Sequence, residues 1–502
     1  MKSLSKIFES AGIIFITIVL SKILGYFFRI IVARTSVELY GTYNLAYIII
    51  SLVIPFCLLG LNIGIMRYVP YYLAKNQKEK ADEVITTVFK IVLPISLAFF
   101  FLFSFSADFI AGFFDVANLS IALRYFAFMI PTLVLLSIFS SILIANQKVI
   151  LVSLFVNVVE SSIRFIVVLV MFYLGFKFLG PILGFLLPNL LILSFVFYYS
   201  KKFFSWKKGS FISEFVFFSI PLSLVSIFLA LIGYMDTIFL GALTDISEVA
   251  FYNVALPTAH LLFIFSTSLL ALFLPLVTEK YAKNQNLKGD YMSVTKWIFM
   301  STLPFSLIMI LFSDNILWIL FGQKYLSASI TLSILAFSFF INSLAQPSKH
   351  ILIMLKKSKL ILVLVCVAFS LNILLNIILI PFFDKNYAHG MYGAALSTMI
   401  SLFFLALSNL IFAYKNTKIF LFNKTHIKIS LAAFMSTLIV YFIQKMFIVQ
   451  SIWHLISFLI IYLFLYVFLI FYLKILEEHD KIVLGALKKR ITSLVPSFLI
   501  RD

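Results

Sequence analysis

The chain has 502 residues, of which 63% are hydrophobic and only 12% are charged, and its formal net charge is +19. Its mean hydropathy is +1.11, and soluble domains carry about 25% charged residues. This composition excludes a soluble enzyme or a cytosolic binding module, because the surface could not be covered with polar groups. Nucleic-acid binding is not expected either, since the basic residues lie in short loops between apolar runs. Cys57 and Cys366 have no disulfide or metal-binding spacing.

Long apolar stretches occupy most of the chain. A membrane-spanning helix needs about 20 mostly apolar residues. Fourteen stretches meet this requirement, and we expect an all-α polytopic membrane protein with fourteen transmembrane helices, at approximately 10–33, 41–68, 86–107, 119–146, 149–173, 180–200, 213–242, 249–277, 291–313, 327–355, 358–382, 390–414, 427–448 and 451–474.

The positive charges predict how these helices are oriented. With the N-terminus inside, 27 of the 39 Lys and Arg residues lie in inside segments, 5 lie in outside loops and 7 lie within helices. Cytoplasmic loops carry an excess of Lys and Arg. We therefore expect a multi-pass protein of the plasma membrane with both termini in the cytoplasm.

Four short motifs recur in the same order at an offset of 209 ± 1 residues. They are Gly25-Tyr26 and Gly233-Tyr234, Tyr43-Asn44 and Tyr252-Asn253, Ala74-Lys75-Asn76-Gln77 and Ala282-Lys283-Asn284-Gln285, and Leu93-Pro94 and Leu303-Pro304. The chain therefore contains two copies of a six-helix unit. We predict an N-lobe at 1–208, a C-lobe at 209–420, and two further helices with a cytoplasmic tail at 421–502. Two such lobes around a central path are typical of an alternating-access transporter.

Ionisable residues within the apolar stretches are candidate site residues, because a lone Lys or Arg at a helix centre costs about 2.5–3.5 kcal/mol. The anions are Glu160 and Asp236, and the cations are Lys22, Arg29, Arg67, Lys90, Arg124, Arg164 and Lys349. Those near helix ends can extend to the membrane surface. Lys22 and Arg29 are two turns apart on one face at mid-span, so we expect them to line a water-filled cavity that receives an anion.

Two acids within the apolar stretches suggest ion pairs. Glu160 and Arg164 have i, i+4 spacing, which is typical of an intrahelical ion pair, although a substrate or gating role stays open. Asp236 has no cation at helical spacing. We favour a cross-lobe pair with Lys22 or Arg29 that acts in gating, and cation or proton binding is the alternative.

Polar stripes on later helices add candidate substrate contacts. One predicted helix carries Asn253, His260 and Thr267 on a single face. A second carries Asn342 and Gln346 on one face with Lys349 or His350. A third carries Asn372 and Asn376. Such stripes form interhelical hydrogen bonds in many membrane bundles, and they also occur in hydrated cavities. The candidate substrate-binding residues are Lys22, Arg29, Arg164, Lys349, His260 and Asn253, and no metal site is expected.

Two segments carry a family resemblance. The segment 32–46, VARTSVELYGTYNLA, resembles the junction of helices 1 and 2 in the polysaccharide (Wzx-type) flippases. The segment 234–241, YMDTIFLG, is similar to their helix 7 pattern. These flippases belong to the multidrug/oligosaccharidyl-lipid/polysaccharide exporter superfamily.

The resemblance implies a transporter, not an enzyme. It implies outward movement of a polyprenyl phosphate- or diphosphate-linked oligosaccharide, with membrane lipids as further partners. We expect a monomer without a bound cofactor, with Na⁺ or H⁺ as a possible coupling ion. Two alternatives stay open: a cation-coupled exporter of small molecules, and a membrane-embedded glycosyltransferase or polymerase, although the outer loops carry only scattered acids.

Overall fold

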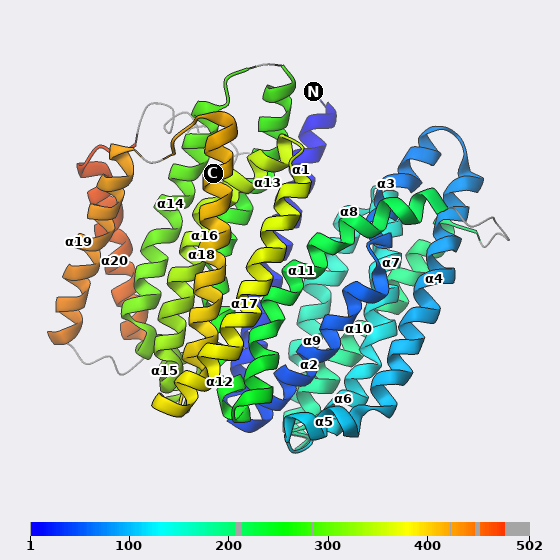
Figure 1. Cartoon of the computed structure of the whole chain (residues 1–502), viewed down its shortest axis with the longest axis horizontal. Coiled ribbons are helices and arrows are strands. Elements are labelled where there is room, and N and C mark those ends of the chain that lie inside the picture. The colour runs from blue at the N-terminus through cyan, green and yellow to red at the C-terminus, as the bar shows by residue number, and fades with distance from the viewer. Residues whose placement is uncertain (1, 206–212, 284, 422, 447–451, 477–502) are drawn as a thin grey trace, which may run out of the picture. The chain divides into compact units, whose positions relative to one another are not determined.

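The computed structural model describes residues 2–205, 213–283, 285–421, 423–446 and 452–476. Within these ranges the chain is helical and has no strand (Figure 1). The elements are α1 (Lys2–Ala33), α2 (Val37–Leu58), α3 (Leu61–Ala74), α4 (Lys78–Phe105), α5 (Ala107–Phe114), α6 (Leu119–Ala127), α7 (Met129–Ala145), α8 (Val149–Val152), the π-helical turn η1 (Ser153–Val159), α9 (Glu160–Tyr173), α10 (Leu179–Ser200), η2 (Lys201–Phe203), α11 (Ser213–Leu243), α12 (Ile246–His260), α13 (Phe263–Ala282), α14 (Lys288–Leu311), α15 (Ser313–Phe321), η3 (Gln323–Ala328), α16 (Ser329–Met354), α17 (Ser358–Tyr387), α18 (Gly390–Thr417), α19 (Lys424–Met446) and α20 (Ile452–Tyr472).

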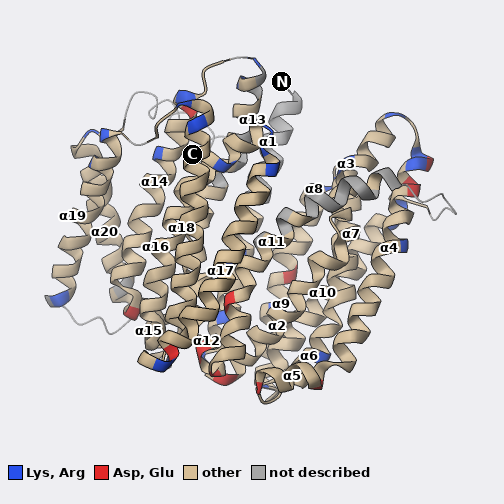
Figure 2. Ribbon diagram, in the orientation of Figure 1, with Lys and Arg blue, Asp and Glu red and all other residues tan. Residues whose placement is uncertain are grey.

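The helices confirm the prediction of an all-α polytopic membrane protein. In the described residues, twelve helical segments are long and apolar enough to cross a membrane, and Ala230–Leu243 and Ile456–Tyr472 are shorter apolar helices. Together they coincide with the fourteen predicted stretches. Figure 2 shows that Lys, Arg, Asp and Glu gather at helix ends and connecting segments, and that few lie at mid-helix.

The predicted span 41–68 consists of two helices. Ser36 begins α2, since its hydroxyl accepts a hydrogen bond from the Leu39 N–H. Leu59 (φ 47°) and Gly60 (φ 70°) both adopt left-handed backbone conformations, which end α2 before α3 begins. Gly41 in α2 lies against the chain at Ile246, because a Cβ there would lie 2.3 Å from the Ile246 carbonyl oxygen.

The described chain forms two compact units. One comprises Met1–Thr258, Leu320–Leu335 and Lys359–Leu402. In it, α1 packs on η1 and α9, α9 on α10, α3 on α4 and α7, and α2 on α11. The predicted lobe boundary at 208 and 209 lies outside the described residues, as does most of the predicted cytoplasmic tail.

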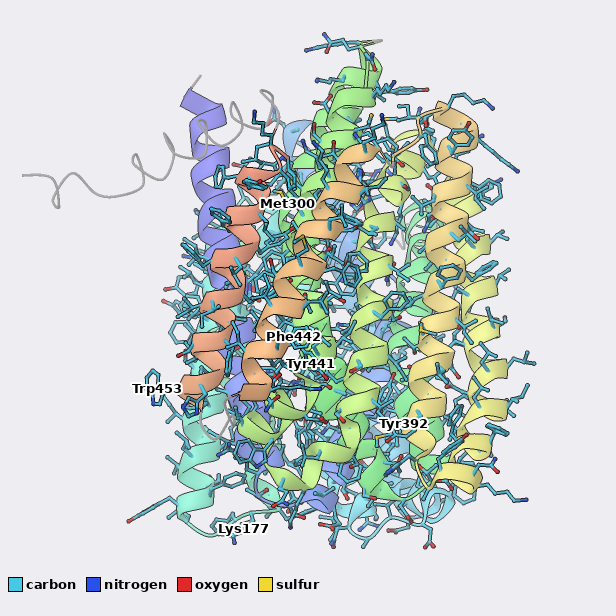
Figure 3. All side chains as sticks on the ribbon, turned by 90° about the vertical axis from the view of Figure 1, so that its left-hand side faces the viewer. Lys177, Met300, Tyr392, Tyr441, Phe442 and Trp453 are labelled. Atoms are coloured by element: carbon cyan, nitrogen blue, oxygen red, sulfur yellow. The ribbon has the colours of Figure 1, made fainter. Side chains whose placement is uncertain are left out.

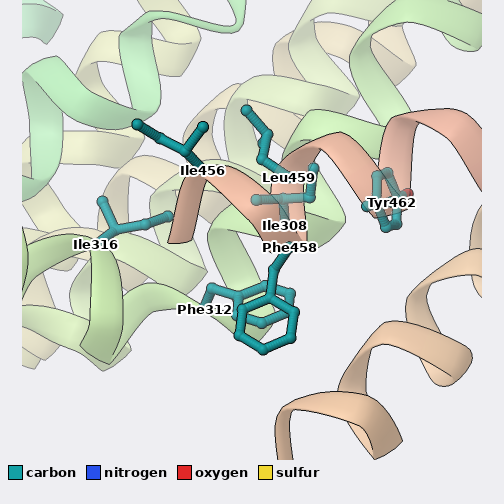
Figure 4. A pocket seen from close by; sticks show the side chains of 7 residues that line it. All are labelled: Ile308, Phe312, Ile316, Ile456, Phe458, Leu459 and Tyr462. Carbon is teal, nitrogen blue, oxygen red and sulfur yellow. The ribbon is translucent and has the colours of Figure 1, made fainter. Parts of the chain in front are cut away.

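The other unit comprises Ala259–Ile319, Ala336–Ser358 and Phe403–Asp502. Its buried cluster combines α14, α16, α19 and α20, and includes Phe299, Phe340, Ile429 and Tyr462. Seven side chains from α14, α15, α20 and the turn at Phe312 line an apolar cavity of about 110 Å³ (Figure 4). The outer faces of α19 and α20 remain apolar, as at Phe442 and Trp453 (63% and 72% exposed; Figure 3), which suits contact with lipid.

Candidate functional site

A cluster of basic and tyrosine side chains lies between α1, α2 and α9. The half-buried Arg29 lies within electrostatic range of Tyr40, Tyr43 and Tyr47. Tyr43 is also within electrostatic range of Arg164. Tyr234 on α11 lies near Arg29 as well. Two arginines that are distant in sequence therefore lie within electrostatic range of Tyr43.

The two arginines of this cluster differ in charge compensation. Arg164 donates from Nε to the Glu160 carboxylate at 3.0 Å and from Nη2 to the same oxygen, so the predicted i, i+4 ion pair is present. Its guanidinium also lies 3.7 Å from the Phe185 ring centroid. No carboxylate within the described residues forms an ion pair with Arg29. Among the residues that the structure describes, no carboxylate therefore balances the charge of Arg29.

Lys22 lies outside this cluster. It is on α1 two turns before Arg29, and its side chain is exposed. Just before Lys22 in the sequence, α1 forms a polar seam with η1 and α9 through the hydrogen bonds of Thr17 with Ser153 and of Ser21 with Ser161 (2.9 Å). Ser153 begins the π-helical turn η1, and such turns are common at functional sites.

A buried aspartate on α11 forms a second polar site. Asp236 is 2% exposed. Its carboxylate accepts hydrogen bonds from the Tyr252 hydroxyl (2.5 Å), the Asn372 and Asn376 amides (3.0 and 2.8 Å) and the Thr398 hydroxyl. These donors come from α12, α17 and α18, so four helices meet at one carboxylate.

The predicted ion pair of Asp236 with Lys22 or Arg29 is not present in this structure. Its described partners are four neutral donors, because Asp236 points among α12, α17 and α18 instead of toward α1. The alternative interpretation, a cation or proton site, fits the residues better. The amide oxygen of Asn376 is buried here without a hydrogen-bond donor. Six oxygens, two of them from one carboxyl group, thus belong to this cluster, and hard cations prefer oxygen ligands.

The remaining candidates lie elsewhere. Asn253 is buried, and its amide donates to Thr237 (3.1 Å) and to the Val249 carbonyl (2.9 Å), which assigns it to helix packing. His260 packs edge-on against Phe339 with ring centroids 4.3 Å apart. Lys349 on α16 is half-buried. No group of three or more His, Cys, Asp or Glu that could hold a metal occurs in the described part of the chain.

Hydrogen bonds also join the first helices to the second half of the chain. The Tyr26 and Thr258 hydroxyls are 2.7 Å apart, and the Tyr40 hydroxyl donates to the Asn253 carbonyl at 3.0 Å. Beyond the end of α1, Tyr325 donates to the Ala33 carbonyl and Arg34 donates to the Leu320 carbonyl, both at 2.8 Å. Tyrosines thus form much of this junction.

The tyrosines and Thr398 were not among the candidate residues predicted from the sequence. Tyr43 and Tyr252 were available as a signal, because they occupy equivalent positions in the repeated motif. Thr398 gives no signal in the sequence, since its role depends on α18 meeting α11.

The helical architecture is that of a polytopic membrane protein with two polar sites among its helices. Residues 7–279 match the family described as polysaccharide biosynthesis protein, and residues 221–378 match the MatE family. The first match covers more than half of the chain, so this chain belongs to the polysaccharide biosynthesis protein family. An uncharacterized membrane protein of Methanocaldococcus jannaschii is 27% identical over 455 residues, which cover 84% of this chain and 87% of that protein.

Solved structures share the fold. The lipid II flippase MurJ in an inward closed conformation superposes with a TM-score of 0.77 at 20% identity, over 92% of this chain and 99% of that one. An inward-facing multidrug resistance MATE family transporter of the MOP superfamily gives a TM-score of 0.68 at 15% identity, over 79% of this chain and 94% of that one. The predicted polysaccharide family is confirmed by the match over residues 7–279, and the solved structures share the fold.

Proposed function

We propose that this protein is a flippase that moves a polyprenyl phosphate- or diphosphate-linked oligosaccharide from the cytoplasmic to the outer leaflet by alternating access. The observation that carries the proposal is the Arg29 cluster: an uncompensated guanidinium, surrounded by tyrosines, in a member of the polysaccharide biosynthesis protein family. The lipid flippase fold supports the same class of cargo.

The chemistry of the cluster suits a phosphate at the head of a lipid. A guanidinium binds phosphate oxygens through paired N–H donors, and it remains charged in an apolar setting. Tyr43 and Tyr234 place further hydroxyl groups beside Arg29. The polyprenyl chain would stay in the bilayer while the charged head enters the cluster, so the protein needs to shield only the polar part of the cargo.

The proposal includes a topology. Both termini are cytoplasmic, the protein resides in the plasma membrane as a monomer, and the lobes 1–208 and 209–420 alternate in access. The charge distribution of 27 inside to 5 outside Lys and Arg residues supports this orientation.

A reconstituted transport assay tests the proposal. Proteoliposomes containing an NBD-labelled polyprenyl diphosphate monosaccharide are treated with dithionite, which reduces only the outer-leaflet fluorophore. We expect Arg29→Ala to lower the flipping rate at least about tenfold, because a hydrogen bond to a charged group contributes about 1.5–3 kcal/mol. Arg29→Lys should retain part of the rate if charge alone suffices.

Arg124→Ala is the matched control, since Arg124 is 52% exposed and pairs with Asp108 away from the cluster. It should flip at the wild-type rate. An unchanged rate in Arg29→Ala would refute the role of the cluster. Efflux of a small organic cation without flipping of the lipid probe would instead identify an exporter, and sugar transfer between lipid carriers would identify an enzyme.

We also infer that Asp236 holds the coupling cation, Na⁺ or H⁺. Asp236, Tyr252, Asn376 and Thr398 would supply the oxygens, with the Asn376 oxygen already free of donors. The cation would neutralise a carboxylate that is otherwise buried among neutral groups, which is costly for an unpaired charge. Its binding would favour the arrangement of α11, α12, α17 and α18 that brings these oxygens together.

The coupling site is tested by the melting temperature of the purified protein in NaCl and in choline chloride. We expect Na⁺ to raise it in the wild type, and Asp236→Asn to remove the effect. If Na⁺ has no effect and flipping instead depends on a pH gradient, H⁺ is the coupling ion. Wild-type flipping and ion response in Asp236→Asn would refute the assignment.

A further inference from the structure

The internal repeat allows the Asp236 pocket to be compared with the other half of the chain. The five pocket residues are Asp236, Tyr252, Asn372, Asn376 and Thr398. Their counterparts are Phe28, Tyr43, Glu160, Arg164 and Asn189, at offsets of 208, 209, 212, 212 and 209 residues. These offsets vary because the connecting segments differ in length. The helices correspond in order: α1 with α11, α2 with α12, α9 with α17 and α10 with α18.

The counterparts contact one another as the pocket residues do. Phe28 lies against Tyr43 with ring centroids 5.9 Å apart, as Asp236 contacts Tyr252. The Arg164 guanidinium lies 5.7 Å from the Phe28 ring centroid, as Asn376 contacts Asp236. Glu160 and Arg164 bond at i, i+4, as Asn376 donates to Asn372 at 3.2 Å.

The fifth member of the set completes the comparison. Asn189 donates to the Glu160 carboxylate at 3.3 Å from α10, as Thr398 donates to Asp236 from α18. Both halves of the chain therefore build a buried carboxylate pocket from the same four helices of the repeat.

The two pockets differ in charge. The Asp236 pocket contains one carboxylate and four neutral partners, so its formal charge is −1. In the other pocket, Phe28 occupies the position equivalent to Asp236, and the carboxylate comes from Glu160 on α9. The Arg164 guanidinium brings the formal charge of these five residues to zero. The side chains of Glu160 and Arg164 are only 6% and 17% exposed. This pocket holds a cation that is covalently part of the protein.

We propose that the Glu160 pocket is a second cation site in which the Arg164 guanidinium takes the place of a monovalent cation. The proposal extends the proposed function. It rests on the coupling site inferred at Asp236, because the comparison treats the Asp236 pocket as a cation site. It implies that only the half of the chain containing Asp236 exchanges an ion with solution. It also implies that removing the guanidinium while keeping Glu160 creates a site for Na⁺.

The test is carried out in full-length Asp236→Asn protein, which removes the response of the first pocket. Melting temperatures are measured at pH 8 in 100 mM NaCl and in 100 mM choline chloride. We expect Asp236→Asn/Arg164→Gln to melt roughly 2 °C or more higher in NaCl. Asp236→Asn/Arg164→Lys should show no such gain, because the ammonium remains tethered.

The triple variant Asp236→Asn/Arg164→Gln/Glu160→Gln is the second control and should also show no gain. Absence of a gain in Arg164→Gln, or an equal gain in either control, would overturn the proposal. Arg164→Ala is a second neutral variant. If neither neutral variant folds in NaCl, the proposal is overturned as well, since the ion should substitute for the guanidinium. If Asp236→Asn keeps the wild-type response to Na⁺, the coupling site at Asp236 is refuted, and the comparison among Arg164 variants still decides the second pocket.

Discussion

Removal of one hydroxyl group at equivalent positions of the repeat should have unequal effects on stability. Tyr252→Phe deletes the donor that lies 2.5 Å from the Asp236 carboxylate, whereas the structure gives the Tyr43 hydroxyl no hydrogen bond within the described residues. A hydrogen bond to a charged group contributes about 1.5–3 kcal/mol in soluble proteins. Interhelical bonds in membranes average about 0.6 and reach about 1.7 kcal/mol, because the separated helices find other partners.

The buried carboxyl acceptor places this bond near the upper end of the membrane range. We expect Tyr252→Phe to lower the free energy of unfolding by about 1–2 kcal/mol, and Tyr43→Phe by less than about 0.5 kcal/mol. Reversible unfolding in mixed micelles, followed by circular dichroism in choline chloride, measures both. Equal losses in the two variants would refute the assignment of Tyr252 to the carboxylate. A double-mutant cycle with Asp236→Asn should show that most of the Tyr252 effect disappears when the charge is removed.

Three further predictions concern packing, capping and topology. Gly41→Ala should lower the free energy of unfolding by about 1–3 kcal/mol, because the new Cβ would lie 2.3 Å from the Ile246 carbonyl oxygen. Gly25→Ala should stabilise the protein slightly, because its Cβ would meet nothing within 4 Å. Thermal melts of both variants compare them directly. Glu248→Ala should cost about 1–2 kcal/mol, because Glu248 accepts from the Met391 N–H at 2.9 Å at the start of α18 and from His389 at 3.1 Å; Glu248→Gln should recover part of the loss in the same melts. In protein lacking Cys57 and Cys366, cysteines introduced at 115, 245 or 384 should react with an impermeant reagent added to intact cells, and those at 78, 207 or 285 should be protected; outside labelling at 207 would contradict the proposed orientation.

The helices were largely predictable because each requirement of the bilayer is local in sequence. A span needs only a sufficient run of apolar residues, and even the two shorter helices of the structure fall within predicted stretches. The break at Leu59-Gly60 was not predicted, since it depends on two consecutive left-handed residues and not on hydrophobicity. The Glu160–Arg164 pair was predictable for the same reason as the helices: both partners lie on one helix, four residues apart.

The partners of Asp236 could not be predicted in the same way. The cost of a buried charge indicated that it needs partners, but not which helices supply them. A cation from α1 and neutral donors from α12, α17 and α18 are both chemically adequate, and tertiary packing selects the second. The repeated motif contained more information than the ionisable residues alone, because it places Tyr252 opposite Tyr43.

The buried cluster that joins α14 to α19 and α20 has a consequence for how the protein is made. About 110 residues separate Leu311, at the end of α14, from Lys424, at the start of α19, which takes roughly 5–20 s of translation. During that interval Phe299 and its neighbours lack the helices that later cover them. In water such a delay would expose an aggregation-prone apolar surface, but lipid chains are as apolar as the missing side chains. The bilayer therefore acts as a temporary substitute for α19, and Asn315, whose oxygen accepts from Gln444 at 2.8 Å, is a polar group that must await its partner.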